Sequence, residues 1–150
     1  MKDIFNQNTV DELLTRLHIL DDKTRPLWGK MDVAQMLAHL NIQYEMVYDD
    51  IHKRPPFLVR GALTLLVKQF VTGEKPYKKN GRTSSLFLVK ASKDFMIEKE
   101  RLIHYLKKTQ QLGKPYFEGK ESFSFGKLSA KEWNNLFYKH IDHHLEQFGV

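Results

Sequence analysis

Apolar residues recur along most of the chain at intervals of three and four positions, the spacing of residues on one face of an α-helix. Turn-forming residues divide this pattern into about five helical segments. The first is expected from near Asn8 to Leu20, with Thr9 as its N-cap and Glu12 completing a capping box. The second is expected from Asp32 to about Tyr48. Because the helical period dominates, the pattern predicts an all-α protein.

Three more helices are expected in the second and last thirds of the chain. Glycine commonly follows a helix because it adopts the left-handed backbone conformation, and Gly73, Gly113 and Gly149 stand at the expected ends. The clearest start is at Ser129, where Glu132 completes a second capping box. The three helices are expected from the prolines at 55 and 56 to about Thr72, from Ser92 as N-cap to about Gln111, and from Ser129 to Gly149.

The segments between these helices have the composition of loops. Residues 74–85 are rich in Lys, Gly and Ser and are expected to be exposed, and residues 114–127 are expected to form a second loop before the last helix. Residues 85–91 fit either a short extended piece or the entry to the next helix. With 150 residues, 41% of them hydrophobic, and no internal repeat, the chain is expected to form a single domain over residues 1–150.

The chain contains no cysteine, which limits the chemistry available to it. Disulfides, thiolate metal ligands, iron–sulfur clusters and a cysteine nucleophile are all excluded. No serine lies in a nucleophile-elbow pattern, and no glycine-rich phosphate loop is present. A bound metal would therefore need nitrogen and oxygen ligands.

A net charge of +6 raises the question of nucleic acid, since clustered Lys and Arg gain affinity for phosphate by releasing counterions. No helix-turn-helix, zinc-finger or RNA-binding signature accompanies the charge. A solvated basic surface or an acidic small substrate is the preferred interpretation, and nucleic acid is not expected as a partner. The basic residues near the glycine-containing loop are Lys75, Lys78, Lys79, Arg82, Lys90 and Lys93.

No targeting or membrane-spanning segment is expected. The N-terminal residues MKDIFNQNTVDELL lack the apolar core of a secretory signal, so a cytoplasmic location is expected. The most apolar stretch, residues 57–71, is interrupted by Arg60 and Lys68 and is too short to span a bilayer, so no membrane is expected as a partner. Spare apolar surface is compatible with a homodimer, which the sequence does not decide.

Two histidines of the last helix, His140 and His144, stand four residues apart and therefore share one face. At roughly 100° per residue, His144 falls about 25° from the centre of the apolar stripe and His140 about 65° from it. His143 points toward the polar side, although it could replace His144 if the helix were rotated. A histidine pair turned into a core is expected to bind a metal or to be hydrogen-bonded internally, because burial without a partner is costly.

His39 lies within the wide apolar arc of the second helix and is the third candidate ligand. Facing helices of a bundle commonly supply the ligands of a metal site. Three nitrogen ligands would leave a coordination position open for water or substrate, as catalytic zinc, nickel or iron requires. Gln35 and Gln43 lie one turn before and after His39, and Gln147 follows His140 by seven residues, so these amides are candidates to contact a bound water or substrate.

Segments 28–40 (WGKMDVAQMLAHL) and 125–149 (FGKLSAKEWNNLFYKHIDHHLEQFG) resemble the DinB-like, or DinB/YfiT, superfamily, and within it a branch of uncharacterised bacterial proteins. The resemblance extends over nearly the whole chain in helix order, but only these two segments are specific. It implies an up-down-down-up four-helix bundle with an extra short helical segment. It also implies a divalent metal held by one histidine of the second helix and a His-x-x-x-His of the last, which fall on His39, His140 and His144.

The resemblance suggests an activity as well as a fold. Other members of the superfamily are transferases that use a low-molecular-weight thiol such as bacillithiol or mycothiol, and many members have no known reaction. Two hypotheses therefore remain open. The first is a divalent-metal-dependent enzyme that transfers or hydrolyses a group on a small molecule, with a thiol as a candidate cosubstrate. The second is a non-catalytic bundle that binds a ligand or partner, with the metal structural or absent.

Overall fold

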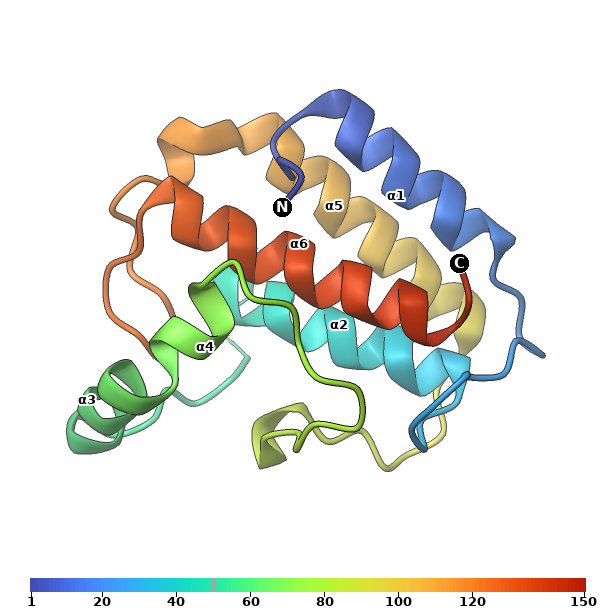
Figure 1. The fold of residues 1–150 in the computed structure, drawn as a ribbon, viewed down its shortest axis with the longest axis horizontal. Helices are drawn as coiled ribbons and strands as arrows, with labels where there is room; N and C mark the ends of the chain where they lie inside the picture. The colour runs from blue at the N-terminus through green and yellow to red at the C-terminus, as the bar shows by residue number, and fades with distance from the viewer. Residues whose placement is uncertain (50) are drawn as a thin grey trace.

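The computed structural model describes residues 1–49 and 51–150, which are helical with irregular connections (Figure 1). The all-α class expected from the sequence is confirmed, since the described residues contain no strand and only one isolated antiparallel bridge, between Glu121 and Lys127. No helix in this part of the chain has both the length and the apolar composition needed to cross a bilayer. The elements are α1 (Gln7–Ile19), α2 (Val33–Tyr48), α3 (Phe57–Leu66), α4 (Lys68–Thr72), a 3-10 turn (Ser85–Phe87), α5 (Phe95–Phe117) and α6 (Ala130–Gln147).

The four longest helices, α1, α2, α5 and α6, lie side by side and share one hydrophobic core (Figure 1). The closest packing of separate elements is between α2 and α5, and α6 contacts α1, α2, α4 and α5. Aromatic rings from three helices stack through the middle of the core, where Tyr44 lies between Tyr105 and Phe137 with centroid distances of 5.5 and 5.0 Å. This packing fixes α2 and α6 against each other, and the histidines of interest lie on these two helices.

Two of the expected helix starts are wrong by two or three residues. The cap of α1 is Asn6, whose side chain accepts a backbone N–H of the first turn, while Thr9 is buried inside the helix. The cap of α5 is Asp94 in place of Ser92. Several residues that favour the N-cap position stand close together at the start of each of these helices, and the sequence does not say which of them is the N-cap. The capping box at Ser129 and Glu132 is confirmed.

Two expected helices also have different extents. The helix expected over 55–72 is broken at Val67, which separates α3 from α4. The helix expected to stop at Gly113 bends there, with φ of 65°, and continues to Phe117. Pro115 fits this continuation because it lies in the first turn after the bend, where its missing N–H is not needed. Of residues 85–91, the first three form the 3-10 turn.

Helix α6 is covered on two sides, which the apolar stripe alone does not predict. Lys139, on the side away from the stripe, is only 3% exposed, and its ammonium group donates to the carbonyl oxygens of Phe70 (2.8 Å) and Gly73 (2.6 Å). Asn135, one turn earlier, donates to the carbonyl oxygen of Thr72 at 2.9 Å. These bonds satisfy the last carbonyls of α4, which have no partners within their own helix. Burial lowers the pKa of Lys139 to about 8.

Replacing Lys139 with alanine should lower the free energy of unfolding by about 1–2 kcal/mol, because two carbonyl groups in partly buried hydrogen bonds lose their donor. Urea denaturation of the variant would measure this. Lys131→Ala is the matched control on the same helix, since its ion pair with Glu74 is exposed and should contribute less than about 0.5 kcal/mol. Equal effects of the two substitutions would contradict the role given to Lys139.

Candidate metal site

Three imidazole rings meet between α2 and α6. His39 comes from α2, while His140 and His144 come from successive turns of α6, and one nitrogen atom of each lies within 4.8 Å of the others. The ring of His39 lies 4.8 Å from that of His140 and 4.7 Å from that of His144, centroid to centroid. The structure thus brings together, from opposite ends of the chain, the three histidines that the sequence singled out.

Two glutamines orient the histidines of α6. The side-chain amide nitrogen of Gln43 donates to the carbonyl oxygen of Leu136 (3.1 Å), which leaves its oxygen to face His140 Nδ1. The amide nitrogen of Gln147 donates to the carbonyl oxygen of Trp28 (2.6 Å), and its oxygen faces His144 Nδ1 at 2.7 Å. Because each glutamine presents an acceptor, each Nδ1 must carry the hydrogen. Gln43 and Gln147 therefore contact the rings, and a contact of these amides with a bound water or substrate stays a prediction.

His39 is oriented in the same way by a backbone group. Its Nδ1 donates to the carbonyl oxygen of Phe87, 2.9 Å away, and a carbonyl can only accept. Phe87 belongs to the 3-10 turn in the connection between α4 and α5, so this connection closes over the site. The tautomers of all three histidines are thus assigned from their partners, with the hydrogen on Nδ1 and the lone pair on Nε2.

The arrangement leaves lone pairs facing one another. The Nε2 atoms of His39 and His140 lie 2.8 Å apart, and with both Nδ1 atoms protonated neither Nε2 has a hydrogen to donate. Two buried acceptors in contact repel each other unless a cation lies near both. Nitrogen ligands at about 2.0–2.1 Å from a tetrahedral zinc ion are roughly 3.4 Å apart, so small movements of the rings would accommodate the ion. The donor set therefore fits a divalent metal.

The protonation state of the cluster supports the same conclusion. Burial lowers the pKa of His39, and burial together with the neighbouring imidazoles holds the pKa of His140 well below its usual value. The pKa of His144 is lowered to about 3, mainly by burial. All three rings are neutral near pH 7, and neutral imidazole is the form that ligates metals.

Other candidate residues lie beside the cluster. His143 is half-buried, with its ring 6.0 Å from Trp28 and 5.7 Å from Tyr77, and is not one of the three converging histidines. Gln35 accepts a hydrogen bond from the backbone of Asp32 in the capping box of α2, so its side-chain oxygen is engaged at the helix end.

Tyr77 and Phe87 form part of the wall around the histidines, and sequence analysis did not select them. The ring of Tyr77 lies 6.4 Å from that of His140, and the ring of Phe87 lies 5.6 Å from that of His39. Both residues are in the connection between α4 and α5, where no helical period applies. Tyr77 and Phe87 are the two aromatic residues of this connection, and no periodic pattern in the sequence indicates that their rings turn inward.

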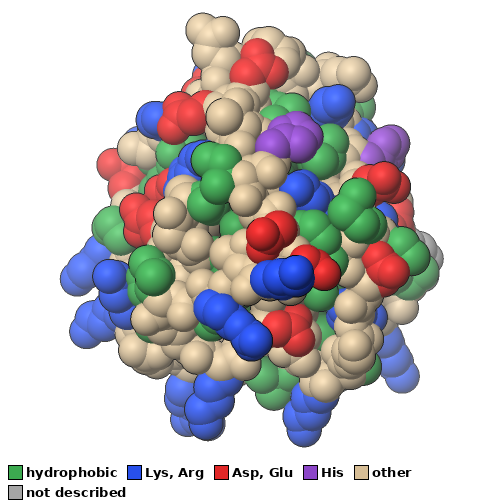
Figure 2. Space-filling model, turned by 90° about the vertical axis from the view of Figure 1, so that its right-hand side faces the viewer, with side chains coloured by type: hydrophobic (Ala, Val, Ile, Leu, Met, Phe, Trp, Pro, Cys, Tyr) green, Lys and Arg blue, Asp and Glu red, His purple; other side chains and the backbone are tan. Residues whose placement is uncertain are grey.

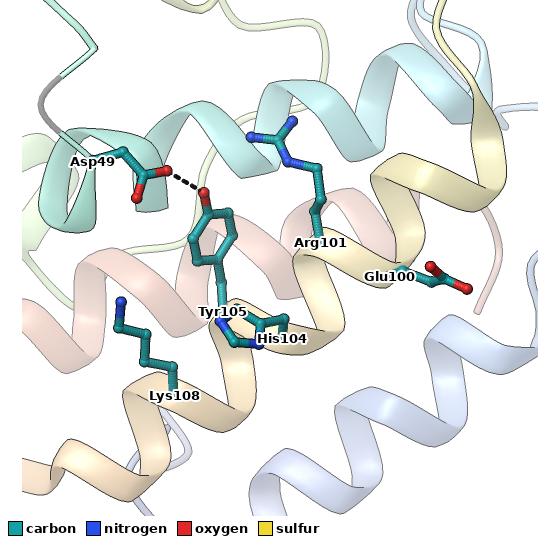
Figure 3. Close-up of a pocket in the computed structure, with 6 residues that line it drawn as sticks. All are labelled: Asp49, Glu100, Arg101, His104, Tyr105 and Lys108. Carbon is teal, nitrogen blue, oxygen red and sulfur yellow. Dashed lines mark hydrogen bonds between the residues drawn. The ribbon is translucent and has the colours of Figure 1, made fainter.

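A separate surface hollow of about 380 Å³ lies beside α5 (Figure 3). Three of its polar side chains are already paired: Tyr105 donates to Asp49, and Arg101 forms ion pairs with Glu45 and Glu98, which lie outside the hollow. Among the described residues, the group that could hold a metal ion is the three histidines and not a set in this hollow. The histidine cluster is therefore the better candidate site. The hollow is lined by Asp49, Glu100, Arg101, His104, Tyr105 and Lys108.

Fold and site together define an all-helical protein with a buried three-histidine cluster able to hold a metal ion. The chain belongs to the family described as "Protein of unknown function (DUF1569)", whose model matches residues 3–149. No curated protein and no solved structure matches the chain. Function must therefore be argued from the site itself.

Proposed function

We propose that His39, His140 and His144 bind one divalent metal ion, and that the protein uses it to transfer or hydrolyse a group on a small molecule. The observation that carries the proposal is the convergence of three neutral Nε2 atoms, each ring held by a hydrogen bond at Nδ1. Metal-ligating histidines characteristically donate their second N–H to such an acceptor. Zinc, nickel and iron all accept imidazole ligands.

The resemblance of the two end segments to the DinB-like superfamily supports the proposal. It implies a metal on the same three histidines within an up-down-down-up four-helix bundle. It also makes a low-molecular-weight thiol a reasonable cosubstrate. A single domain, a cytoplasmic location, a homodimer and a small-molecule substrate stay predictions of the sequence.

The chain's own residues have defined tasks in this proposal. Gln43 and Gln147 hold the imidazoles of α6 with Nε2 directed to the metal, and the Phe87 carbonyl does so for His39. The rings of Tyr77 and Phe87 lie beside the cluster and limit the access of bulk water. A bound divalent ion would supply Lewis-acid activation of a water or thiol near neutral pH, which no side chain here offers.

The competing function is a non-catalytic bundle with a structural metal. The observation in its favour is burial, since His39 and His144 are only 4% and 7% exposed. Structural zinc sites usually have four protein ligands, however, whereas three residues converge here. Three ligands leave a position for an exogenous molecule.

Cobalt(II) provides the test of this difference. Protein purified without a nickel column and loaded with cobalt(II) should bind one equivalent, and its visible spectrum should change when a small thiol is added. His143→Ala is the control, because it removes an adjacent imidazole outside the cluster and should bind cobalt(II) as the wild type does. A spectrum that thiol leaves unchanged would favour the structural metal, and failure to bind any metal would refute both forms of the proposal.

The glutamines give a graded prediction. Gln43→Ala and Gln147→Ala should each lower zinc affinity by about 10–100-fold, because the imidazole loses the acceptor that fixes its orientation. Competition with a chromogenic chelator would measure the affinities. Gln111→Ala, an exposed glutamine of α5, should leave the affinity unchanged. Equal affinities across all three variants would show that the glutamines do not orient the ligands.

A further inference from the structure

Helix α3 turns its apolar side toward solvent. Phe57, Leu58, Leu65 and Leu66 are each 82–85% exposed, and α3 has no buried residue. At about 100° per residue, the arc from Phe57 through Leu58 and Leu65 to Leu66 covers half the helix circumference, and it contains no charged residue. Monomeric proteins rarely expose a contiguous apolar surface of this kind unless it binds something.

The polar side of α3 faces the protein and fixes the helix in this orientation. The Arg60 guanidinium lies on that side and pairs with Glu121 at 2.5 Å. The Thr64 hydroxyl, one turn later on the same side, donates to the carbonyl oxygen of Arg60 at 2.8 Å within α3 itself, so the contact with the rest of the protein is made by Arg60. Rotating α3 to bury its leucines would break the ion pair between Arg60 and Glu121. The outward direction of the apolar side is therefore a property of the fold.

The net positive charge of the protein is concentrated in the same part of the chain. Residues 51–94 contain ten Lys and Arg against two Asp and Glu, while the other residues contain 14 and 16. The remainder of the protein is thus slightly acidic. Arg54, Arg60 and Lys68 pair with Glu121 and Glu132 outside the segment, and the seven other basic residues still leave the segment that exposes apolar side chains with a net positive charge.

The two features lie toward the same edge of the molecule. In Figure 1, α3 and the connection between α4 and α5 both occupy the lower part of the view. In Figure 2, which keeps the same vertical axis, Lys and Arg side chains project from the lower edge. The connection adds two exposed leucines, Leu86 (45%) and Leu88 (53%), to the apolar side chains of α3.

We propose that residues 51–94 form a binding surface for anionic lipid bilayers. Apolar side chains of a surface helix insert at the boundary between headgroups and acyl chains, and Lys or Arg beside them bind anionic headgroups. A second copy of this chain fits less well, because pairing through α3 would bring together two segments of the same strong positive charge. Contact at the lipid surface is compatible with the finding that no described helix spans a bilayer, but it departs from the expectation from the sequence that no membrane is a partner.

Co-sedimentation of the full chain with vesicles tests the proposal. The protein should bind vesicles containing roughly 30% phosphatidylserine in phosphatidylcholine, and should bind pure phosphatidylcholine far less. Binding should weaken steeply at about 1 M salt, where the screening length falls to about 3 Å. Absence of binding to the anionic vesicles at low salt would overturn the proposal.

Two pairs of substitutions separate the apolar and the basic contributions. Leu58→Gln with Leu65→Gln should weaken vesicle binding at least about tenfold, because both side chains are exposed and would lose insertion. The matched control is Ile19→Gln with Met96→Gln, two exposed apolar residues outside the segment. Both double variants should unfold at the wild-type temperature, since no buried contact is lost.

The basic side chains are tested in the same way. Lys75→Gln with Lys78→Gln should weaken binding by about 30-fold, at about 1 kcal/mol for each lysine near an anionic surface. Lys23→Gln with Lys30→Gln, an exposed pair elsewhere, should have little effect.

Three results would replace the proposal with another partner. If the Leu58→Gln, Leu65→Gln variant bound vesicles as the wild type does, α3 would not insert, and the binding would come from charge attraction alone. A dimer in sedimentation velocity that this variant dissociates, together with no vesicle binding, would identify a second copy as the occupant. Salt-sensitive binding of a DNA oligonucleotide that exceeds vesicle binding would assign the charge to nucleic acid.

Discussion

Replacing His140 and His144 with alanine is expected to abolish the stabilisation that zinc gives to the wild-type protein. A ligand that binds only the folded state at about 1,000 times its dissociation constant adds about 4 kcal/mol to the free energy of unfolding. Two of the three converging nitrogens come from these residues, and one remaining imidazole cannot hold the ion in the folded protein. Urea denaturation with and without zinc, on protein first stripped with a chelator, would measure the difference.

The neighbouring His143 provides the control for this experiment. Its imidazole belongs to the same helix but lies outside the cluster, so His143→Ala should retain the full gain from zinc. If the double variant gained as much stability from zinc as the wild type, the metal would be bound elsewhere and the proposed site would be wrong.

The metal-free protein is expected to lose stability as the pH falls from about 7.5 to about 5.5. The folded state holds the three histidines neutral, with the pKa of His144 at about 3, whereas in the unfolded chain they titrate near pH 6.5. Below that pH the unfolded state binds more protons, so unfolding is favoured. His144 alone accounts for about 1.4 kcal/mol over this range, and His39 and His140, whose pKa values are also lowered, add to the loss in the same direction.

Denaturation curves at several pH values in the presence of a chelator would measure this dependence. His104→Ala, which removes an exposed histidine of α5 outside the cluster, is the matched control. His144→Asn should flatten the pH dependence, because one buried titrating group is gone. A free energy of unfolding that stays constant from about pH 7.5 to about pH 5.5 would show that the folded state protonates these histidines freely.

Much of the site could be predicted because it depends on periodicity. His140 and His144 share a face of α6 through their spacing, and His39 lies within the apolar arc of α2, so each is directed toward a core whatever the details of packing. The four long helices follow from the same period. The sequence also shows that Gln43 and Gln147 lie about one turn from a histidine of the same helix. It does not show that their amide nitrogens donate to the backbone carbonyls of Leu136 and Trp28, which leaves their oxygens to accept from the histidines.

The rest could not be predicted because it depends on what covers each face. Lys139 is buried because the end of α4 lies on the polar side of α6, and a polar side chain gives no sign of this in the sequence. Helix α3 has a regular apolar stripe, from which a core-facing helix would be expected, yet the stripe is exposed. The Phe87 carbonyl is a backbone group in an irregular segment, where residue type carries little information about position.

X-ray absorption at the zinc edge tests the central claim most directly. Protein purified without a nickel column and loaded with one equivalent of zinc should show a first shell containing three imidazole nitrogens at about 2.0–2.1 Å, with one further light atom. His143→Ala should give the same spectrum. A shell of oxygen atoms with one imidazole or none would contradict the convergence of His39, His140 and His144 on a single ion.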